Sequence, residues 1–234
     1  MSSTAVISGA SSGIGKILAE ELAKVGFQVV IAARSKDKLQ KISNNIQLQG
    51  GRCLSIPTDV SKPGDIKKLK NETLNFGSVE ILVNNAGMGH FGPVESLSIE
   101  EWNQQLDVNL RAAFLLSQAF IPEMKKASKG TLVFINSIAG RQPFSQSAAY
   151  VASKFGLRGL ASSLREELRE NNIKVISVYP GAVNTPFWDK INGDFSREDM
   201  LNASALAQMI LQSIQAPGNL TVEELVVRRV AGDI

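Results

Sequence analysis

Apolar and polar positions follow two patterns along the chain, and these patterns predict its secondary structure. Short continuous apolar runs, rich in valine and isoleucine, suit strands that are covered on both faces of a parallel sheet. The segments between them have helical patterns of apolar and polar residues. We expect strands at residues 4–8, 28–33, 52–56, 80–83, 131–136, 174–179 and 224–230. We expect helices at residues 14–24, 36–48, 64–75, 100–126, 148–170 and 204–214.

Alternation of strands and helices along the whole chain indicates βαβ units with right-handed crossovers. No linker, low-complexity tract or internal repeat divides the 234 residues. We therefore expect one α/β domain over residues 1–234. It would be a doubly wound Rossmann domain, with a seven-stranded, mostly parallel sheet and helices on both faces.

Composition and charge narrow the classes of function. Hydrophobic residues make up 44% of the chain and charged residues 20%, which is ordinary for a globular protein. A net charge of +3 gives no basic stripe, so we expect neither nucleic acid nor a membrane surface as partner. The single Cys53 excludes an internal disulfide, and His90 is the only histidine, so we expect no metal site. The first residues do not form a signal peptide, which predicts a cytoplasmic protein.

The first predicted strand runs directly into a glycine-rich turn, SGASSGIG, that opens the first predicted helix. Glycines here permit a tight turn and let backbone N–H groups and the helix N-terminus approach a pyrophosphate. A purely structural turn is the alternative. The position between strand and helix favours a dinucleotide-binding turn. Its expected contact residues are Gly9, Ser11, Ser12, Gly13, Ile14 and Gly15.

The end of the second predicted strand, VVIAARSKDKL, indicates which dinucleotide would bind. Ala33 stands where an acidic side chain would bind the ribose hydroxyls, and Arg34 and Ser35 follow it. The strand end therefore lacks a carboxylate that would repel a 2′-phosphate. Arg34 offers a planar cation suited to phosphate oxygens. We therefore predict NADP(H), held in part by Arg34 and Ser35. The alternative is a solvated arginine followed by a helix N-cap.

Tyr150 and Lys154 are four residues apart on a predicted helix and should share a face. A free tyrosine has a pKa of about 10, which makes it a poor general acid at neutral pH. An ammonium roughly 5 Å away would contribute about 3 kcal/mol at an effective dielectric constant near 20, or about two pKa units. We therefore expect Lys154 to lower the pKa of Tyr150 toward ~8. An ordinary surface pair is the alternative.

Taken together, these segments resemble the short-chain dehydrogenase/reductase family over essentially the whole chain. Besides the glycine turn and Tyr150 with Lys154, the matching segments are TDV at 58–60, NNAG at 84–87, VNL at 108–110, INS at 135–137 and PGAVNTP at 180–186. The resemblance implies a catalytic set of Asn109, Ser137, Tyr150 and Lys154. In it, Tyr150 is the acid/base, Ser137 donates to the carbonyl oxygen, and Asn109 anchors a water near Lys154.

The resemblance also implies cofactor contacts beyond the glycine turn. Tyr150 and Lys154 would contact the cofactor as well as the substrate, with Lys154 holding the ribose hydroxyls. The remaining implied contacts are Asp59 and Val60 at the adenine, Asn85, Ala86 and Gly87 at the adenosine ribose, and Pro180, Gly181, Val183 and Thr185 at the nicotinamide. Family members pair subunits through the equivalents of the two long helices, which implies a homodimer or homotetramer.

The substrate side should lie in the loops beyond the strand ends. A polar, glycine-punctuated segment at about 186–200 suggests a lid. We expect Arg141 to be a solvated side chain. We expect His90 to be an ordinary loop residue. The aromatic residues of these loops would line an apolar pocket or pack the loops themselves; they are Phe91, Phe144, Phe187, Trp188 and Phe195.

The resulting prediction is an NADPH-dependent oxidoreductase that interconverts a carbonyl and a secondary alcohol by hydride transfer, with Tyr150 as acid/base. The substrate would be a small molecule. Two alternatives within enzymes are a 3-ketoacyl-carrier-protein reductase and a sepiapterin-like pteridine reductase. The C-terminal TVEELVVRRVAGDI lacks the glycine-rich ending of many carrier-protein reductases. The alternative outside enzymes is an NADP-sensing regulatory protein.

Overall fold

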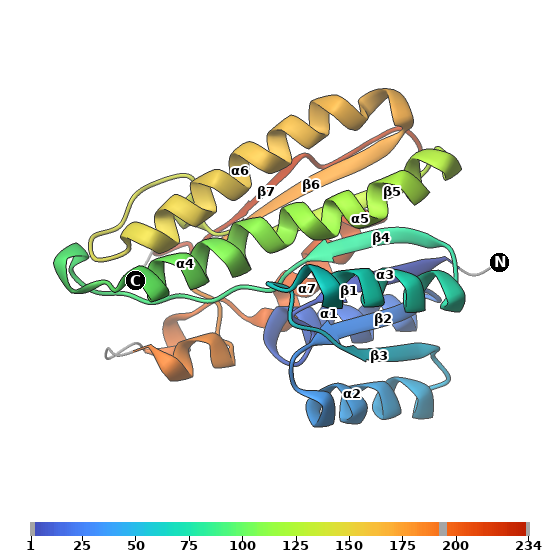
Figure 1. Cartoon of the computed structure of the whole chain (residues 1–234), viewed down its shortest axis with the longest axis horizontal. Coiled ribbons are helices and arrows are strands. Elements are labelled where there is room, and N and C mark those ends of the chain that lie inside the picture. The colour runs from blue at the N-terminus through green and yellow to red at the C-terminus, as the bar shows by residue number, and fades with distance from the viewer. Residues whose placement is uncertain (1–2, 192–195, 233–234) are drawn as a thin grey trace.

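The apolar runs of the sequence form seven strands of one sheet, in the order β3-β2-β1-β4-β5-β6-β7 (Figure 1). The computed structural model describes residues 3–191 and 196–232. Every pairing between neighbouring strands is parallel. The strands are β1 Thr4–Ser8, β2 Gln28–Ala33, β3 Cys53–Pro57, β4 Val79–Asn84, β5 Gly130–Ile135, β6 Ile173–Pro180 and β7 Glu224–Val227. The predicted seven-stranded α/β architecture is confirmed.

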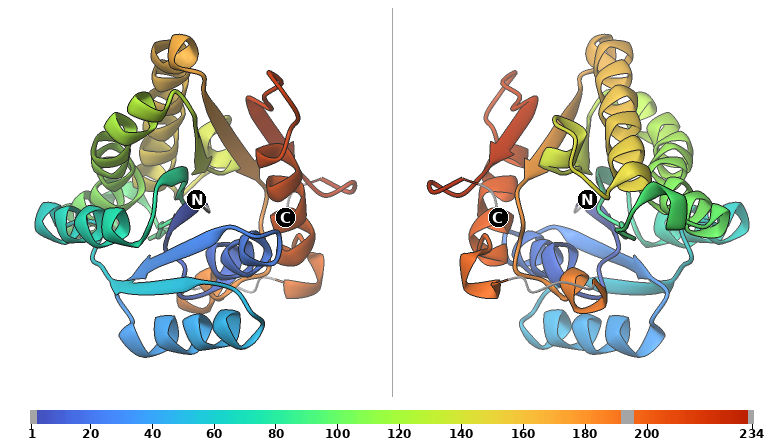
Figure 2. Two further views of the ribbon diagram at one scale, coloured as in Figure 1. Left: turned by 90° about the vertical axis from the view of Figure 1, so that its right-hand side faces the viewer. Right: turned by 90° about the vertical axis from the view of Figure 1, so that its left-hand side faces the viewer.

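Helices cover both faces of the sheet, as the edge-on views of Figure 2 show. One face packs against α1 (Gly13–Lys24), α2 (Lys36–Leu48) and α7 (Ala203–Ile214). The other packs against α3 (Pro63–Phe76), α5 (Ala112–Ala127) and α6 (Ala148–Leu168). Neighbouring residues of one strand point to opposite faces of the sheet. Ile7 packs in the core beneath α1, α2 and α7, and Val6 packs in the core beneath α3, α5 and α6. The strands are apolar on both sides for this reason.

The helix expected at 100–126 is interrupted. The structure has α4 (Ile99–Leu106), a π-helical turn η2 (Asp107–Arg111) and then α5. A π turn inserts one residue into the helical ladder and is frequent at functional sites. Here it contains Asn109, whose side chain is buried.

The last strand is shorter than expected, because it ends at Val227 instead of residue 230. The apolar run is broken by two arginines, of which Arg229 forms an ion pair with Asp199 at 2.6 Å. Val230 is fully exposed. In the described part of the chain, none of the helices has the length and apolar character that a membrane span requires.

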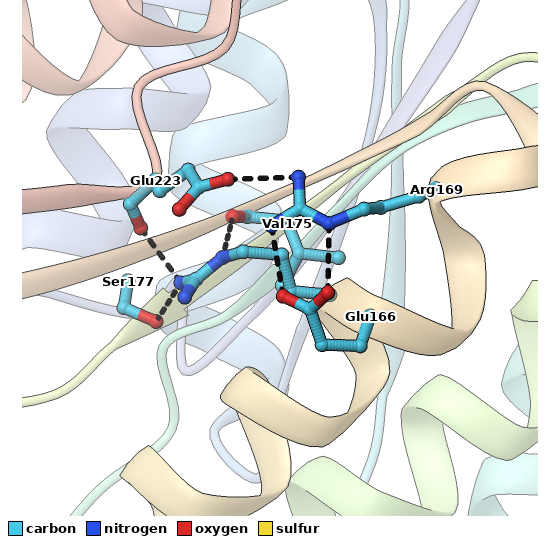
Figure 3. Close-up of polar contacts among 6 residues, drawn as sticks. Glu166, Arg169, Val175, Ser177 and Glu223 are labelled. Carbon is cyan, nitrogen blue, oxygen red and sulfur yellow. Dashed lines mark hydrogen bonds and ion pairs between the residues drawn. The ribbon is translucent and has the colours of Figure 1, made fainter.

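A buried arginine attaches β7 to the rest of the domain (Figure 3). Arg165 on α6 donates to Val175 O at 3.2 Å, to Ser177 Oγ at 3.2 Å and to Glu223 O at 2.8 Å. Arg169, one turn later, pairs with the Glu223 carboxylate at 3.0 Å. The residue that precedes β7 is therefore held by both α6 and β6.

Candidate active site

The predicted site residues lie at the carboxyl ends of the strands, where the chain order reverses between β1 and β4. Open α/β sheets bind ligands at such a switch point. The turn after β1 has Gly9 at φ +65° and Gly13 at φ +55°, a backbone region that favours glycine. A Cβ on Gly9 would lie 2.7 Å from Ala86 Cα, so only glycine fits this turn beside β4.

Asn85 shapes this turn from the end of β4. Its Nδ2 donates to Ser8 O at 2.9 Å and to Gly9 O at 3.1 Å. The Ser8 hydroxyl accepts from the backbone N–H groups of Asn85 and Ala86, at 3.0 and 3.2 Å. A Cβ on Gly15 would collide with the Asn85 amide. Asn85, expected at the adenosine ribose, thus uses its side-chain N–H groups to bind the backbone of the turn.

The segment after β6 lies against the same turn. A Cβ on Gly13 would be 3.2 Å from Thr185 Cβ, so the helix N-terminus and Thr185 face each other. Gly181 N–H donates to Val227 O at 2.8 Å, which fixes the start of this segment, and Val183 forms a parallel bridge with Leu201. The structure therefore brings the predicted phosphate and nicotinamide residues together.

The N-terminus of α1 is open to an anion. Ser12 is its N-cap, but the Ser12 side chain makes no capping hydrogen bond, and no acidic residue lies in the first turn. The first backbone N–H groups of a helix lack partners within the helix and carry the positive end of its dipole. This end of the site suits a phosphate group.

Arg34 and Asp59 lie at the ends of β2 and β3. Arg34 is exposed, and no carboxylate among the described residues lies within ion-pair distance of it. Burial opposes ionisation of Asp59, but hydrogen bonds from Ser61, together with the Lys62 and Arg34 cations, outweigh it and lower the Asp59 pKa. Ser35 is the N-cap of α2 without a capping hydrogen bond. The predicted Val60 is buried.

Tyr150 and Lys154 share one face of α6, as predicted. Lys154 Nζ lies 5.7 Å from the centre of the Tyr150 ring. The same nitrogen donates to Ile135 O, at the end of β5, at 3.0 Å. Lys154 is 5% exposed, whereas Tyr150 is half-buried.

The expected lowering of the Tyr150 pKa is wrong. Burial raises the pKa of Tyr150 to about 12, and the hydrogen bond with the Ser137 hydroxyl offsets this only in part. Burial lowers the pKa of Lys154 to about 8. Desolvation disfavours the charged form of both groups, and for Tyr150 it outweighs the attraction of the nearby ammonium.

Asn109 and Ser137 complete the predicted set. Asn109 Oδ1 accepts from Met88 N–H at 2.8 Å, and its Nδ2 donates to Met88 O at 2.9 Å and to Ser153 Oγ at 3.0 Å. Ser137 follows β5, and its Oγ accepts from Ala139 N–H at 3.1 Å. A Cβ on Gly87 would lie 3.5 Å from Asn109 Oδ1 and 4.0 Å from Lys154 Nζ, so these two groups flank Gly87.

Three buried polar residues of the site were not singled out from the sequence. Ser153 donates to Tyr150 O at 2.7 Å, and Asn136 Nδ2 donates to Lys154 O at 3.1 Å. Gln105 Oε1 accepts from His90 N–H at 3.0 Å. A signal was present, because Asn136 directly precedes Ser137, and Ser153 lies between Tyr150 and Lys154.

Two aromatic rings contact the Tyr150 ring. The Phe91 ring centre lies 5.3 Å and the Phe187 ring centre 6.2 Å from that of Tyr150, and Trp188 packs on Phe187 at 5.6 Å. Phe144 makes no ring contact among the described residues. Phe195 and residues 192–194 of the expected lid lie outside the described residues.

Arg141 is exposed, as expected, but its charge is not free. It forms an ion pair with Glu224 of β7 and lies over the Tyr179 ring, 5.2 Å from its centre. Arg197 similarly pairs with Asp189 at 2.5 Å and donates to Thr185 O at 2.7 Å. These two cations near the site are therefore neutralised within the chain.

A family model described as short chain dehydrogenase matches residues 3–195. The chain belongs to the short-chain dehydrogenase family. A sepiapterin reductase of Chlorobaculum tepidum is 34% identical over 237 residues, covering 98% of this chain and 97% of the relative.

Solved structures of the family are similar in fold and sequence. An alcohol dehydrogenase from the archaeon Thermococcus sibiricus, complexed with 5-hydroxy-NADP, superposes with a TM-score of 0.91 at 31% identity, covering 98% of this chain and 97% of the other. A metagenomic short-chain oxidoreductase in complex with NADP superposes with a TM-score of 0.86 at 34% identity, covering 97% of each chain.

Proposed function

We propose that this short-chain dehydrogenase is an NADPH-dependent oxidoreductase that interconverts a carbonyl and a secondary alcohol. The observation that carries the proposal is the placement of Tyr150, Lys154 and Ser137 together, with the Lys154 ammonium near Gly87 after β4. A protonated phenol, a buried amine and a hydroxyl thus converge at the carboxyl edge of the sheet. This is the geometry that protonation of a developing alkoxide requires.

The residues present fit a dinucleotide with a 2′-phosphate. The Gly9–Gly15 turn and the uncapped N-terminus of α1 suit a pyrophosphate, and the exposed Arg34 suits the 2′-phosphate. Ser35, Asp59 and Val60 would border the adenosine, and Pro180 to Thr185 the nicotinamide. Two similar solved structures, one complexed with 5-hydroxy-NADP and one with NADP, support this assignment. When bound, the reduced nicotinamide supplies the hydride.

Tyr150 is the proposed proton donor. With a pKa of about 12 it keeps its proton at neutral pH, so it can donate when the carbonyl oxygen becomes an alkoxide. The products are the alcohol and a phenolate. Lys154, with a pKa of about 8, is mainly protonated at pH 7, and its charge favours that phenolate.

Ser137 and Asn109 have supporting roles in the proposal. The Ser137 hydroxyl already interacts with the phenol of Tyr150, so both donors can reach one oxygen atom. Asn109 fixes Met88 and Ser153 beside Lys154, and its Oδ1 keeps a second lone pair for a water that returns a proton to the site.

Two alternative enzymes make different demands on the pocket. A ketoacyl-carrier-protein reductase needs a basic docking patch, whereas Arg141 and Arg197 are both paired with carboxylates. A pteridine reductase is favoured by the 34% identity to the sepiapterin reductase. A regulatory NADP sensor would have no need of the four catalytic side chains, all of which this chain retains.

The test is NADPH consumption with a panel of diketones, aldehydes, β-ketoesters, thioester analogues and pteridines. Replacing Tyr150 with phenylalanine should reduce turnover at least ~1,000-fold, because the proton donor is lost. NADPH binding, followed by protein fluorescence, should stay within about threefold. Turnover by Tyr150→Phe at the rate of the parent would refute the assignment.

We further propose a homo-oligomer that pairs through α5 and α6. An apolar groove between these helices is lined by Phe114, Ile121, Pro122 and Leu164, and Phe114 is 45% exposed. Contiguous apolar surface of this kind marks protein contacts. Light scattering should give a multiple of the 25.2 kDa chain mass, and Phe114→Glu should reduce it. A monomer at all concentrations would contradict this.

A further inference from the structure

Two side chains of one helix hold the loop that precedes the substrate side of the site. Asn109 binds both the N–H and the C=O of Met88. Gln105, one turn earlier on α4, accepts from the N–H of His90. Met88 and His90 are thus attached to two successive turns, at Asn109 and Gln105. Residues 88–90 have a defined backbone position for this reason.

The identity of Gln105 is not explained by packing. Its side chain is completely buried, and its Nε2 atom has no hydrogen-bond partner among the described residues. Burying an amide with an unsatisfied donor lowers stability, and a methionine or leucine would avoid this. The amide offers one thing that an apolar residue cannot, which is the acceptor for His90 N–H.

The loop position matters because Phe91 follows directly. The Phe91 ring packs on the ring of Tyr150. A Cβ on Gly89 would lie 2.7 Å from the Phe91 ring and 3.0 Å from the Phe187 ring, so the backbone and both rings are in close contact. A small shift of residues 88–90 would therefore move Phe91 relative to the phenol.

We propose that Gln105 is a positioning residue that holds Phe91 beside Tyr150 and so limits the bulk of the carbonyl substrate. The proposal rests on the proposed carbonyl reduction. Without the acceptor, the loop relaxes and Phe91 moves away from Tyr150. Substrates with a bulky group next to the carbonyl then gain relative to small ones.

The experiment compares Gln105→Met with Gln104→Met, a matched change of an exposed neighbour on the same helix. The measurement is the ratio of kcat/KM for a bulky and a small ketone. Gln105→Met should shift this ratio by about fivefold or more toward the bulky ketone, and Gln104→Met should leave it unchanged. A general loss of stability would lower both rates and leave their ratio constant, so an unchanged ratio overturns the proposal.

Four further variants test the route through Phe91. Phe91→Leu should shift the ratio by itself, and adding Gln105→Met to it should have little further effect, whereas additive effects would overturn the proposal. Gln105→Glu keeps an acceptor oxygen and should preserve the ratio. If Gln105→Met does not fold, Gly89→Ala displaces Phe91 without touching Gln105, and an unchanged ratio there also overturns the proposal.

Hydrogen exchange separates this proposal from the proposed function. The amides of residues 88–91 should exchange faster in Gln105→Met than in Gln104→Met, whether or not a ketone is reduced. If exchange is faster but the protein reduces no ketone, the missing activity refutes carbonyl reduction and, with it, the effect on substrates. Equal exchange would refute the positioning role even in an active enzyme.

Discussion

Lys154 should lower the stability of the domain, because its buried amine has no carboxylate partner in the part of the chain that the structure describes. Its Nζ lies in the interior, and burial lowers its pKa from 10.5 to about 8. A difference of about 2.5 pKa units corresponds to about 3 kcal/mol of unfavourable folding free energy while both states are protonated. The Lys154→Met variant removes this cost and also the hydrogen bond to Ile135 O, which is worth about 1 kcal/mol. We expect it to be more stable by about 2 kcal/mol at pH 7 and inactive.

The sign of the pH dependence follows from the lowered pKa. Below about pH 8 the amine is protonated in the folded and in the unfolded chain, so the full cost applies. Between about pH 8 and pH 10.5 the folded protein releases this proton and the unfolded chain keeps it, so the parent protein gains stability. At pH 10 the advantage of Lys154→Met should have fallen by roughly 2.5 kcal/mol, to near zero.

Urea unfolding of both proteins at pH 7 and pH 10 measures this difference. All other titrating groups are common to the two proteins and cancel to first order. Lys41→Met, at an exposed position of α2, is the control and should change stability by less than about 0.5 kcal/mol at either pH. A Lys154→Met advantage that is absent at pH 7, or that is equal at both pH values, would refute the reasoning about burial.

Three other predictions concern the cofactor, the last strand and the thiol. Arg34→Glu should raise the KM for NADPH by roughly 30-fold or more and favour NADH, because a carboxylate would face the 2′-phosphate; unchanged cofactor preference in steady-state kinetics would contradict the assignment. Arg165→Met should lower the free energy of unfolding by about 3 kcal/mol, since two buried acceptors and one partly buried acceptor lose a hydrogen bond. Arg169→Met, which removes only exposed ion pairs, should lower it much less, and equal effects in urea titrations would count against this difference. Burial raises the pKa of Cys53 to about 11, so a disulfide reagent at pH 8 should label the native protein at least ~100-fold more slowly than the unfolded one. Equal labelling rates would show that the thiol is not buried.

The fold could be predicted from the sequence because its signals are local. The bounds expected for β1, β2 and α2 agree with the structure, since each apolar run or helical pattern ends at a clear polar or glycine boundary. The π turn at Asn109 could not be predicted in this way. The periodicity of residues 99–127 is helical throughout, and the extra residue is accommodated by contacts with Met88 and Ser153, from other parts of the chain.

Parts of the site depended on information that no local pattern contains. Arg141 pairs with Glu224, 83 residues away, so its neutralisation is a property of the folded chain. The pKa of Tyr150 depends on how many rings and backbone groups exclude water from the phenol, whereas spacing to Lys154 indicates only the charge nearby. The residue types of the site could be predicted from sequence, and their electrostatics required coordinates.

The contacts that Asn85 makes with the glycine turn have a consequence for the order in which the site is assembled. They join residues 76 and 77 positions apart, so β1 and α1 by themselves lack the amide that fixes the turn. A nascent chain that has not yet paired β4 with β1 would present a loose glycine loop with little affinity for nucleotide. Capacity to hold the dinucleotide should arise only once the centre of the sheet has closed, and free nucleotide should act late in folding.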